Sequence, residues 1–526
     1  MIAKKQDETY QEYRDRVINN ISPSFCGAKW YNATIWLGNG TTASCHHPPA
    51  HKIPLEELEV SYKALHNTKY KKAVRKEMLD GIKPKECEYC WKIEGMGDDK
   101  VSDRVFKSVI YSDEDLKKCE TEHSHTENVD LKTLEIAFDP VCNFACSYCN
   151  SSFSTTWQRD IKRSGPYQNL VSDGAGAFQH DGSHALPYGR EEGANPYVNA
   201  FWEWWEEDLQ HSLRELRVTG GEPSMSPSFW RLMDWWEDNK DCDVEFAVNS
   251  NLGQKKALLD KLIESSHNFK SWTLYTSCES VGKHAEYIRD GLDWEMWINN
   301  VERVMTEANS HSVNCMLTIN ALCLFSLPEF LDEMVRLKQK HNSTSPACSF
   351  NILRFPSFQS VVTLPNEIRL ERAQALEDWL DENYNDGENG FLDWERDGLQ
   401  RLISYLREID EGHRYTSSIK TRERDFKSFY QQYDKRRGKD FLETFPELKE
   451  WWDSIPVTDL SVIQDLIDGD DAKSNPYVNE VLDKAEDEGW VLNPQWANPG
   501  AQDYEEPTDD REQEDILSYI NRDDKK

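Results

Sequence analysis

The chain has 526 residues, more than one ordinary hydrophobic core supports, so we expect two or three domains. Its formal net charge of −34 at pH 7 repels phosphate, which argues against nucleic acids and anionic membranes as partners; solubility is the simpler reason for the charge. No signal-peptide pattern and no apolar run of membrane-spanning length occurs, so we expect a cytoplasmic protein whose 13 cysteines stay reduced.

The first predicted domain, residues 1–125, is a cysteine-rich α+β segment. Two of its cysteines flank a predicted β-hairpin that turns at 38–40, and a C-x2-C pair follows a predicted helix over 67–81. Four thiolates would make a closed metal site, for which spacing alone favours zinc over a [4Fe–4S] cluster. The predicted ligands are Cys26, Cys45, Cys87 and Cys90. We interpret the neighbouring His46, His47 and His51 as loop histidines, with a role as spare ligands as the alternative.

The second predicted domain, residues 126–365, alternates short apolar segments with amphipathic helical patterns. The predicted strands are 133–138, 213–220, 244–251, 272–278, 312–320 and 348–355. Repeated strand–helix alternation predicts an α/β fold with a parallel sheet or partial barrel and helices outside. The active site of such a fold lies at the carboxyl ends of its strands. The stretch 165–197 interrupts the alternation and is predicted to be a loop, either a lid or plain surface.

A cysteine loop follows the first of these strands. Cys142, Cys146 and Cys149 have the spacing C-x3-C-x2-C, and thiolates select iron–sulfur clusters and zinc. Three thiolates could hold three corners of a [4Fe–4S] cube and leave one iron open. A zinc site completed by a remote residue, or buried free thiols, are the alternatives.

The loop "CNFACSYC" (142–149) and the segment "TGGEP" (219–223) at the next strand end together resemble the radical S-adenosylmethionine (radical SAM) superfamily. The match includes Tyr148, at the aromatic position before the last cysteine. The resemblance implies a partial (β/α)6 TIM-like barrel and a catalytic [4Fe–4S] cluster on the three loop cysteines. SAM would bind the fourth iron, and its reductive cleavage would give a 5′-deoxyadenosyl radical that abstracts a hydrogen atom from a substrate.

The resemblance also implies a SAM-binding set at the strand ends: Tyr148, Gly220, Gly221, Glu222, Asn249, Ser250, Ser277, Glu279, Arg289 and Asn320. The two glycines let the backbone approach a ligand closely, and Glu222 or exposed carbonyls could accept from the SAM ammonium. For Ser250 and the adjacent Asn251, helix capping is the alternative. Arg289, predicted on the helix after the fourth strand, suits a carboxylate but could be an ordinary surface arginine.

The N-terminal segment is similar to the twitch domain, the shortened SPASM auxiliary-cluster domain of some radical SAM enzymes. The shared features are the Gly40-x4-Cys45 hairpin and a helix that leads into C-x2-C. The segment differs in preceding the barrel, in lacking further cysteines, and in having His46 where a second cysteine is often seen. The resemblance implies an auxiliary [4Fe–4S] cluster on the four N-terminal cysteines, with zinc as the alternative.

Residues 366–495 are predicted to form a helical C-terminal region, and 496–526 an acidic, disordered tail. We therefore predict an oxidoreductase-like radical SAM enzyme with an unidentified substrate, peptides being candidates, and a small flavodoxin- or ferredoxin-type reductant. The alternative is a metal- or cluster-stabilised binding or electron-transfer protein that does not cleave SAM. Four further cysteines, in or beside apolar strands, are predicted core thiols: Cys278, Cys315, Cys323 and Cys348.

Overall fold

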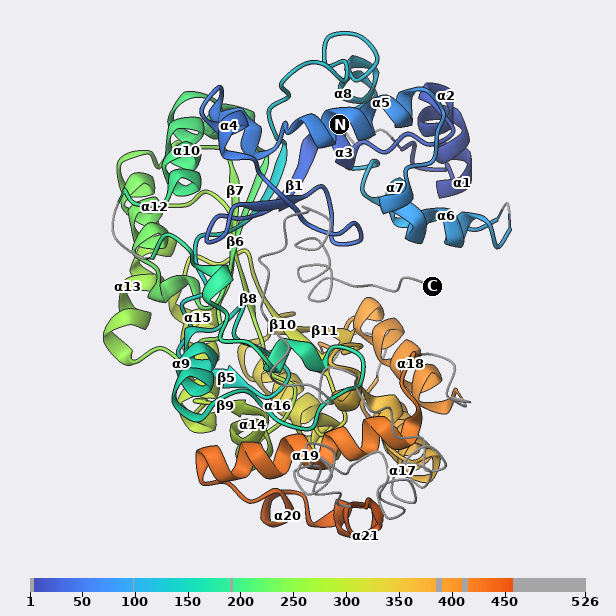
Figure 1. Ribbon diagram of the computed structural model, residues 1–526, viewed down its shortest axis with the longest axis vertical. Coiled ribbons are helices and arrows are strands. Elements are labelled where there is room, and N and C mark those ends of the chain that lie inside the picture. The colour runs from blue at the N-terminus through green and yellow to red at the C-terminus, as the bar shows by residue number, and fades with distance from the viewer. Residues whose placement is uncertain (1–3, 98, 190–192, 385–389, 409–414, 457–526) are drawn as a thin grey trace, which may run out of the picture.

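A computed structural model describes residues 4–97, 99–189, 193–384, 390–408 and 415–456 (Figure 1). The predicted acidic tail at 496–526 lies outside the described residues, as does the part of the helical region from 457 to 495. Among the described residues, no helix is long and apolar enough to cross a membrane.

The fold is mixed α/β and is built on a nine-stranded sheet with the order β11-β10-β8-β7-β6-β4-β1-β2-β3. All six strands predicted between 126 and 365 are present, and each pairs in parallel with its sheet neighbours. They are β4 (Thr133–Ala137), β6 (Glu215–Thr219), β7 (Glu245–Asn249), β8 (Trp272–Thr276), β10 (Ser312–Ile319) and β11 (Ala347–Ile352). Their carboxyl ends therefore meet at one edge, where the cysteine loop begins.

The N-terminal segment contributes the other three strands of this sheet. β1 (Asn32–Trp36) pairs in parallel with β4, while β2 (Thr41–Ala43) and β3 (His51–Lys52) continue the sheet in antiparallel pairing. The hairpin predicted at 38–40 is present and turns at Gly40, whose φ of +70° is in the left-handed region that glycine tolerates. Elsewhere this segment has a small core of its own, centred on Trp30, Tyr111 and Leu116.

Helices follow most strands and lie along the outer side of the sheet (Figure 1). They are α9 (Thr155–Ser164), α10 (Pro196–Trp204), α12 (Pro227–Asp238), α13 (Lys256–Ser266), α14 (Gly282–Ile288), α15 (Trp294–Glu307) and α16 (Leu327–His341). The N-terminal segment adds α5 (Lys69–Leu79), α6 (Glu88–Glu94), α7 (Asp103–Phe106) and α8 (Asp113–Lys118). In the predicted loop 165–197 the described residues hold two short 3-10 turns and the start of α10.

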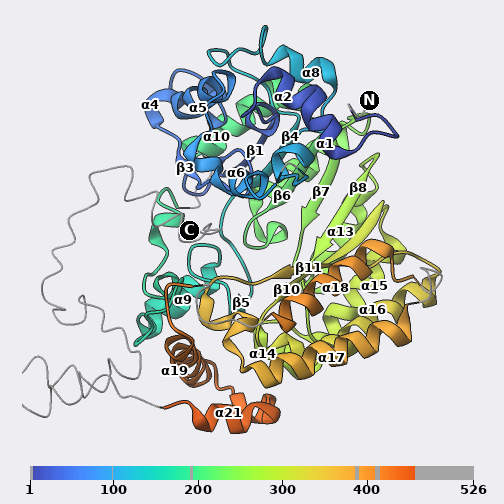
Figure 2. The same ribbon diagram turned by 90° about the vertical axis from the view of Figure 1, so that its right-hand side faces the viewer.

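The C-terminal region is helical, as predicted, over its described residues. It comprises α17 (Asn366–Asn383), α18 (Asp393–Arg407), α19 (Ile419–Arg437), α20 (Phe441–Thr444) and α21 (Lys449–Ser454). α18 packs on β11, and α17 contacts both α18 and α16. Figure 2 shows these helices beside β10 and β11. These helices therefore cover the β11 edge of the sheet.

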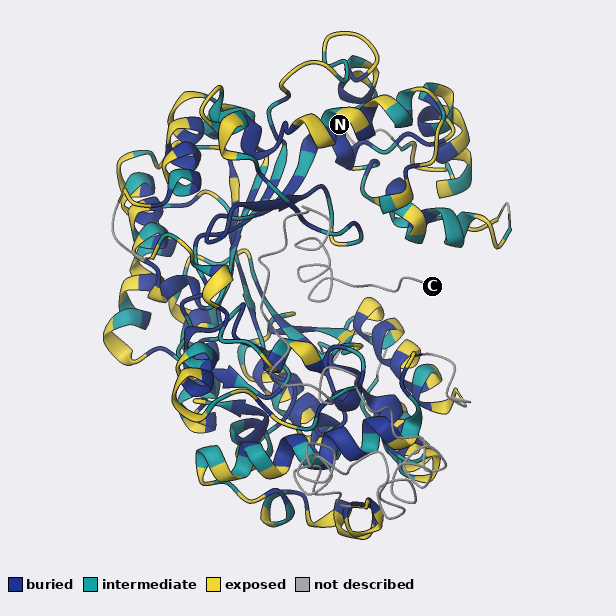
Figure 3. Ribbon diagram, in the orientation of Figure 1, coloured by how far each residue is buried: buried dark blue, intermediate teal, exposed yellow. Residues whose placement is uncertain are grey.

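The two faces of the sheet differ in polarity. Along β10, buried residues alternate strictly with half-buried ones, and Figure 3 shows the buried positions concentrated where strands meet helices. The half-buried positions of the central strands carry polar side chains such as Glu135, Arg217, Tyr275 and Asn314. The face turned away from the helices is thus a polar surface and not a second apolar core. The four cysteines predicted as core thiols are all buried.

Candidate functional site

The cysteine loop leaves the carboxyl end of β4 and is held by a two-stranded ribbon. β5 (Ala145–Cys146) pairs antiparallel with β9 (Arg289–Asp290), which sets Cys146 directly opposite Arg289. The prediction that Arg289 lies on a helix is wrong, because α14 ends at Ile288 and Arg289 begins β9. The idea of a surface arginine is also wrong, since Arg289 is only 4% exposed.

All three thiols of the loop are half-buried, and the sulfur atoms of Cys142 and Cys146 have hydrogen-bond donors near them. The Phe144 amide donates to the Cys142 sulfur at 3.4 Å, and the Asn251 amide nitrogen lies 3.8 Å from the same atom. Arg289 Nη1 lies 3.8 Å from the Cys146 sulfur. Burial raises the pKa of Cys142 to about 12 and also raises the pKa of Cys146 and of Cys149. These donors would favour the thiolate forms that a metal centre needs.

The glycine pair after β6 packs directly against the cysteine loop. Gly220 has a φ of +142°, and the Glu222 amide donates to the Val141 carbonyl at 2.6 Å. A Cβ atom on Gly221 would lie 2.2 Å from the Val141 carbonyl oxygen and 2.7 Å from that of Pro140. Close approach of two backbones thus requires glycine here.

Gly221→Ala should therefore displace the loop and reduce metal binding by its cysteines several-fold, measured as iron bound per chain after anaerobic reconstitution. Gly176→Ala is the matched control, since a Cβ there meets no atom within 4 Å and neither Gly176 nor Gly221 has a positive φ. Equal iron binding by Gly221→Ala and the parent would show that the close approach is dispensable.

Glu222 is the hub of a buried hydrogen-bond network. Its Oε1 accepts from the Ser224 hydroxyl at 2.7 Å, the Gln254 amide at 2.8 Å and the Ser250 hydroxyl at 2.9 Å. Its Oε2 accepts from the Asn251 backbone amide at 2.6 Å. Burial raises the pKa of this carboxyl group, and the hydrogen bonds from Ser224 and Asn251 oppose that rise. Protein donors thus occupy both oxygens of the Glu222 carboxylate.

The residues after β7 take two kinds of position. Ser250 belongs to the Glu222 network, and Asn251 donates through its side chain to Asn143 Oδ1 at 2.8 Å. Neither caps α13, whose N-cap is Lys255, so the capping alternative is wrong. Asn249 Nδ2 reaches only the Met316 sulfur, at 3.9 Å, and its Oδ1 is buried with no hydrogen-bond partner among the described residues. Asn249 is the residue of this segment that is free to bind a ligand.

Arg289, Glu279 and Tyr148 form a compact charged group beside Cys146. Arg289 Nη2 lies 2.6 Å from Glu279 Oε2, and its Nε is 3.2 Å from each oxygen of Glu279. The Tyr148 hydroxyl donates to Glu279 Oε1 at 3.2 Å. Burial alone would lower the pKa of Arg289, but Glu279 raises it well above its usual value. The arginine is therefore a fixed cation next to the Cys146 sulfur.

The two remaining predicted residues lie further along the strand ends. Ser277 is half-buried just after β8. Asn320 is 1% exposed, and its Oδ1 accepts from the amides of Leu322 at 3.0 Å and Cys323 at 3.1 Å. Its side chain is thus engaged in a turn after β10. Elsewhere at the strand ends, a small cavity lies between the ends of β1, β4 and β6. Its lining includes Trp36, Asp139, Gly220 and Gly221.

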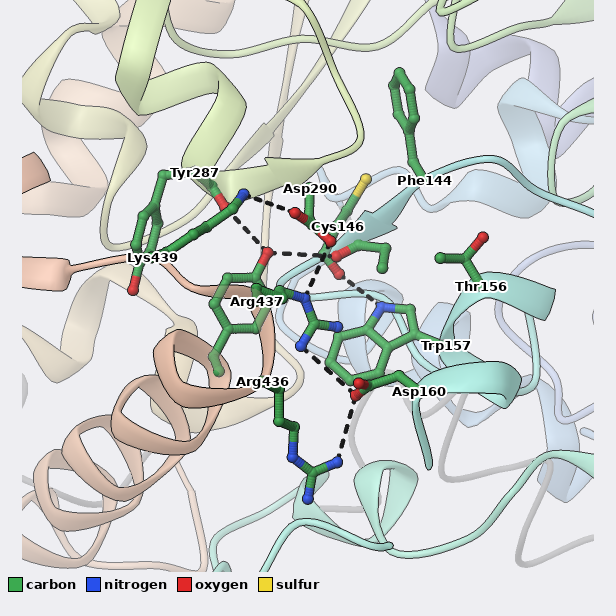
Figure 4. A network of polar contacts seen from close by, with 12 residues as sticks. Phe144, Cys146, Thr156, Trp157, Asp160, Tyr287, Asp290, Arg436, Arg437 and Lys439 are labelled. Atoms are coloured by element: carbon green, nitrogen blue, oxygen red, sulfur yellow. Dashed lines mark hydrogen bonds and ion pairs between the residues drawn. The ribbon is translucent and has the colours of Figure 1, made fainter. Parts of the chain in front are cut away.

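Helix α19 holds the cysteine loop from the outside, which sequence analysis did not predict (Figure 4). The Tyr433 hydroxyl donates to the Ala145 carbonyl at 3.4 Å, and Trp157 Nε1 donates to the Cys146 carbonyl at 3.0 Å. Arg437, the last residue of α19, lies over the Trp157 ring at 4.6 Å and the Tyr433 ring at 4.1 Å. Its Nε donates to Asp290 Oδ2 at 3.1 Å. One buried cation thus joins α19 to α9 and to β9, the strand that pairs with the loop.

The four predicted N-terminal ligands come together in one cavity. Cys26, Cys45, Cys87 and Cys90 all line it, with Lys29, Met78, His47 and Arg104 among the other lining residues. Burial raises the pKa of Cys45 to about 11 and of Cys90 to about 12. Four thiols converging in one partly enclosed space fit a tetrathiolate metal centre.

The N-terminal histidines have structural contacts. His47 stacks on Tyr89, between the two cysteines of C-x2-C, with ring centroids 3.9 Å apart, and its Nε2 lies 2.6 Å from Asp103 Oδ2. These contacts tie the chain after Cys45 to α6 and α7. His51 bonds to Thr68 Oγ1 at 2.9 Å.

No protein-family model matches the chain, and no curated protein matches it. Several chains of solved structures, in contrast, match this chain. Native anSMEcpe with bound AdoMet is 14% identical, with a TM-score of 0.30, over 50% of this chain and 62% of that one. SuiB from Streptococcus suis bound to S-adenosylmethionine is 11% identical, with a TM-score of 0.30, over 67% of this chain and 69% of that one. Both of these structures hold S-adenosylmethionine, which is abbreviated as AdoMet in the name of the first.

A third structure, SuiB bound to the precursor peptide SuiA, is 13% identical, with a TM-score of 0.29, over 66% of this chain and 70% of that one. The chain spans about 62% of the length of the anSMEcpe structure. At TM-scores near 0.30 these similarities are weak, so we base the proposed function on the residues of the site.

Proposed function

We propose that this protein is a radical SAM enzyme with a catalytic [4Fe–4S] cluster on Cys142, Cys146 and Cys149. The observation that carries the proposal is the loop itself: three half-buried thiols at a strand end, with amide and guanidinium donors at 3.4–3.8 Å from two of the sulfurs. The backbone of Gly221 packs against the same loop, close to the carbonyls of Val141 and Pro140. When bound, the cluster and SAM would supply a 5′-deoxyadenosyl radical that takes a hydrogen atom from the substrate.

Different residues of the chain would bind different groups of SAM. The carbonyls of 219–221 would accept from the SAM ammonium, with Glu222 holding that segment to Ser250 and Asn251. Asn249, whose Oδ1 is buried without a partner among the described residues, would bind a ribose hydroxyl. Arg289 already pairs with Glu279, so we assign it to the Cys146 thiolate and only secondarily to the SAM carboxylate. Ser277 and Asn320 would line the pocket as framework.

The polar face of the sheet is the proposed substrate surface, within a partial (β/α)6 barrel. Glu135 and Arg217 are neighbours across β4 and β6, and the Arg217 guanidinium lies 4.2 Å from the centre of the Tyr275 ring. No hydrogen bond or ion pair among the described residues reaches the Glu135 carboxylate, which leaves it available to a substrate cation. An extended chain with both charged and polar groups suits this surface, and we propose a peptide.

The N-terminal cysteines would hold an auxiliary [4Fe–4S] cluster, with zinc as the alternative. Because four thiolates fill the ligand positions, we assign this centre to electron transfer or bracing and not to direct substrate binding. A small flavodoxin or ferredoxin is the proposed reductant.

Anaerobically reconstituted protein should contain about eight irons per chain, as two four-iron clusters require, and should cleave SAM when reduced with dithionite. Cys146→Ala should abolish the cleavage and lower the iron content by about half. Cys242→Ala is the matched control, because that cysteine is also half-buried and lies outside both sites.

Retained SAM cleavage in Cys146→Ala would overturn the assignment. Metal binding without 5′-deoxyadenosine under any reductant would favour a binding or electron-transfer protein. Deuterium transfer from labelled peptides into 5′-deoxyadenosine would test the substrate class.

A further inference from the structure

Three basic side chains are buried together in the N-terminal segment. Lys29 is 2% exposed, Lys71 1% and Arg75 0%. Lys29 pairs with Glu86, and among the described residues this is the single carboxylate that any of the three contacts. Lys71 Nζ donates to Thr42 Oγ1 at 2.8 Å, with His66 Nδ1 at 3.2 Å, and Arg75 donates to the Lys29 carbonyl at 3.1 Å and to Asn67 Oδ1 at 2.9 Å. Burial lowers the pKa of Lys71 well below its usual value and that of Arg75 to about 10. With all three side chains protonated, two more positive charges than negative ones would be buried here.

The three basic side chains lie on two helices, each of which contributes a residue to the lining of the four-cysteine cavity. Lys29 lines it directly. Lys71, Arg75 and Met78 share one face of α5, because they are spaced four and three residues apart, and Met78 also lines the cavity. Thr42, the partner of Lys71, lies on β2, which leads into Cys45. The basic cluster therefore reaches the cysteine cavity through Lys29 and Met78, which line it, and through Thr42 on β2, the strand before Cys45.

Uncompensated buried charge is costly, so a surplus of this kind calls for an anion. No carboxylate among the described residues provides it. Four neutral thiols would not provide it either. Four thiolates around a divalent ion, or around a [4Fe–4S] core in its 2+ state, carry a net charge of minus two. That charge equals the surplus left after Glu86 neutralises one of the three cations.

We propose that Lys29, Lys71 and Arg75 are the counter-charge of a dianionic tetrathiolate metal centre on Cys26, Cys45, Cys87 and Cys90. The inference rests on the proposed function only in taking these cysteines as metal ligands. It adds that the bound metal centre carries a net charge of minus two, and that the stability of the N-terminal segment depends on this centre.

Lys71→Met in the full chain tests the inference, because its effect should depend on the metal. In the loaded protein the variant should lose metal from this site about tenfold faster to a chelator, and its thermal midpoint should fall. In the metal-free protein the midpoint should be unchanged or higher, since replacing a buried cation by an apolar side chain is often neutral or stabilising. Lys71→Arg, which keeps the charge, should retain metal nearly as the parent does.

Lys76→Met is the matched control, because Lys76 is an exposed residue of the same helix and pairs with Asp80. An equal fall of the midpoint with and without metal would assign Lys71 a purely structural role and overturn the inference. Should Lys71→Met not fold, faster metal loss from Lys71→Gln than from Lys71→Arg decides the same question. If the parent protein binds no metal at the four cysteines, the proposed metal site itself fails, which is a separate result.

Discussion

Glu279→Gln should lower the free energy of unfolding by about 3–5 kcal/mol, because it leaves the buried Arg289 without its counter-ion. Both side chains are almost fully buried, at 5% exposure for Arg289 and 1% for Glu279, and they are joined by a 2.6 Å contact. The Tyr148 hydroxyl would also lose its carboxylate acceptor. Urea unfolding of the reduced, metal-free protein measures the change.

An exposed ion pair provides the control for this substitution. Asp80→Asn removes the exposed partner of Lys76 at the end of α5 and should change the free energy of unfolding by less than about 1 kcal/mol. The double variant Glu279→Leu with Arg289→Met should recover most of the lost stability, because it removes both charges together. A loss below about 1 kcal/mol for Glu279→Gln would mean that water reaches the pair.

The central sheet could be predicted because its signal is local. Each of the six parallel strands β4, β6, β7, β8, β10 and β11 is a short apolar run bounded by turns, and the helical patterns between most of them indicate parallel pairing. The same logic placed the cysteine loop, "TGGEP" and "NSN" at one edge. Strand β1 was not predicted to join this sheet, because its partner β4 lies about a hundred residues away and no local pattern encodes that register.

Roles within the site were harder to predict than its position. The motif identified Glu222, but only the fold reveals that Ser250, Gln254 and the Asn251 amide already bind its carboxylate. Gln254 has no recognisable motif. Arg289 was identified from its position after a strand, whereas its burial depends on β9, a two-residue strand too short to be recognised from sequence.

The contribution of α19 illustrates a limit of sequence reasoning. Tyr433 and Arg437 read as ordinary residues of an amphipathic helix, and about 290 residues separate Tyr433 from the Ala145 carbonyl to which it donates. Their positions beside the loop arise from how the C-terminal region packs on the rest of the fold. No residue spacing in the sequence encodes such contacts, so only the structure reveals them.

Arg437→Met should loosen the cysteine loop even without metal. Arg437 is buried, at 6% side-chain exposure, and it bonds to Asp290 at 3.1 Å and to the Tyr167 hydroxyl at 2.8 Å. A hydrogen bond to a charged group contributes about 1.5–3 kcal/mol to stability. A loss of about 1.4 kcal/mol from the free energy of local opening raises the population of the open form about tenfold. We therefore expect Cys146 in the metal-free protein to be alkylated about tenfold faster, with faster amide exchange over 145–149.

Arg303→Met separates this local effect from a general loss of an arginine. Arg303 also bridges two carboxylates, Asp260 at 2.8 Å and Glu307 at 2.7 Å, but it does so on the surface of α15. Its replacement should leave Cys146 alkylation unchanged. If Arg437→Met lowers the thermal midpoint and yet Cys146 reacts at the parental rate, α19 stabilises the fold without holding the loop. Faster alkylation confined to the loop would instead show that α19 supports the proposed cluster site. A cluster bound by three thiolates requires all three to be held in place.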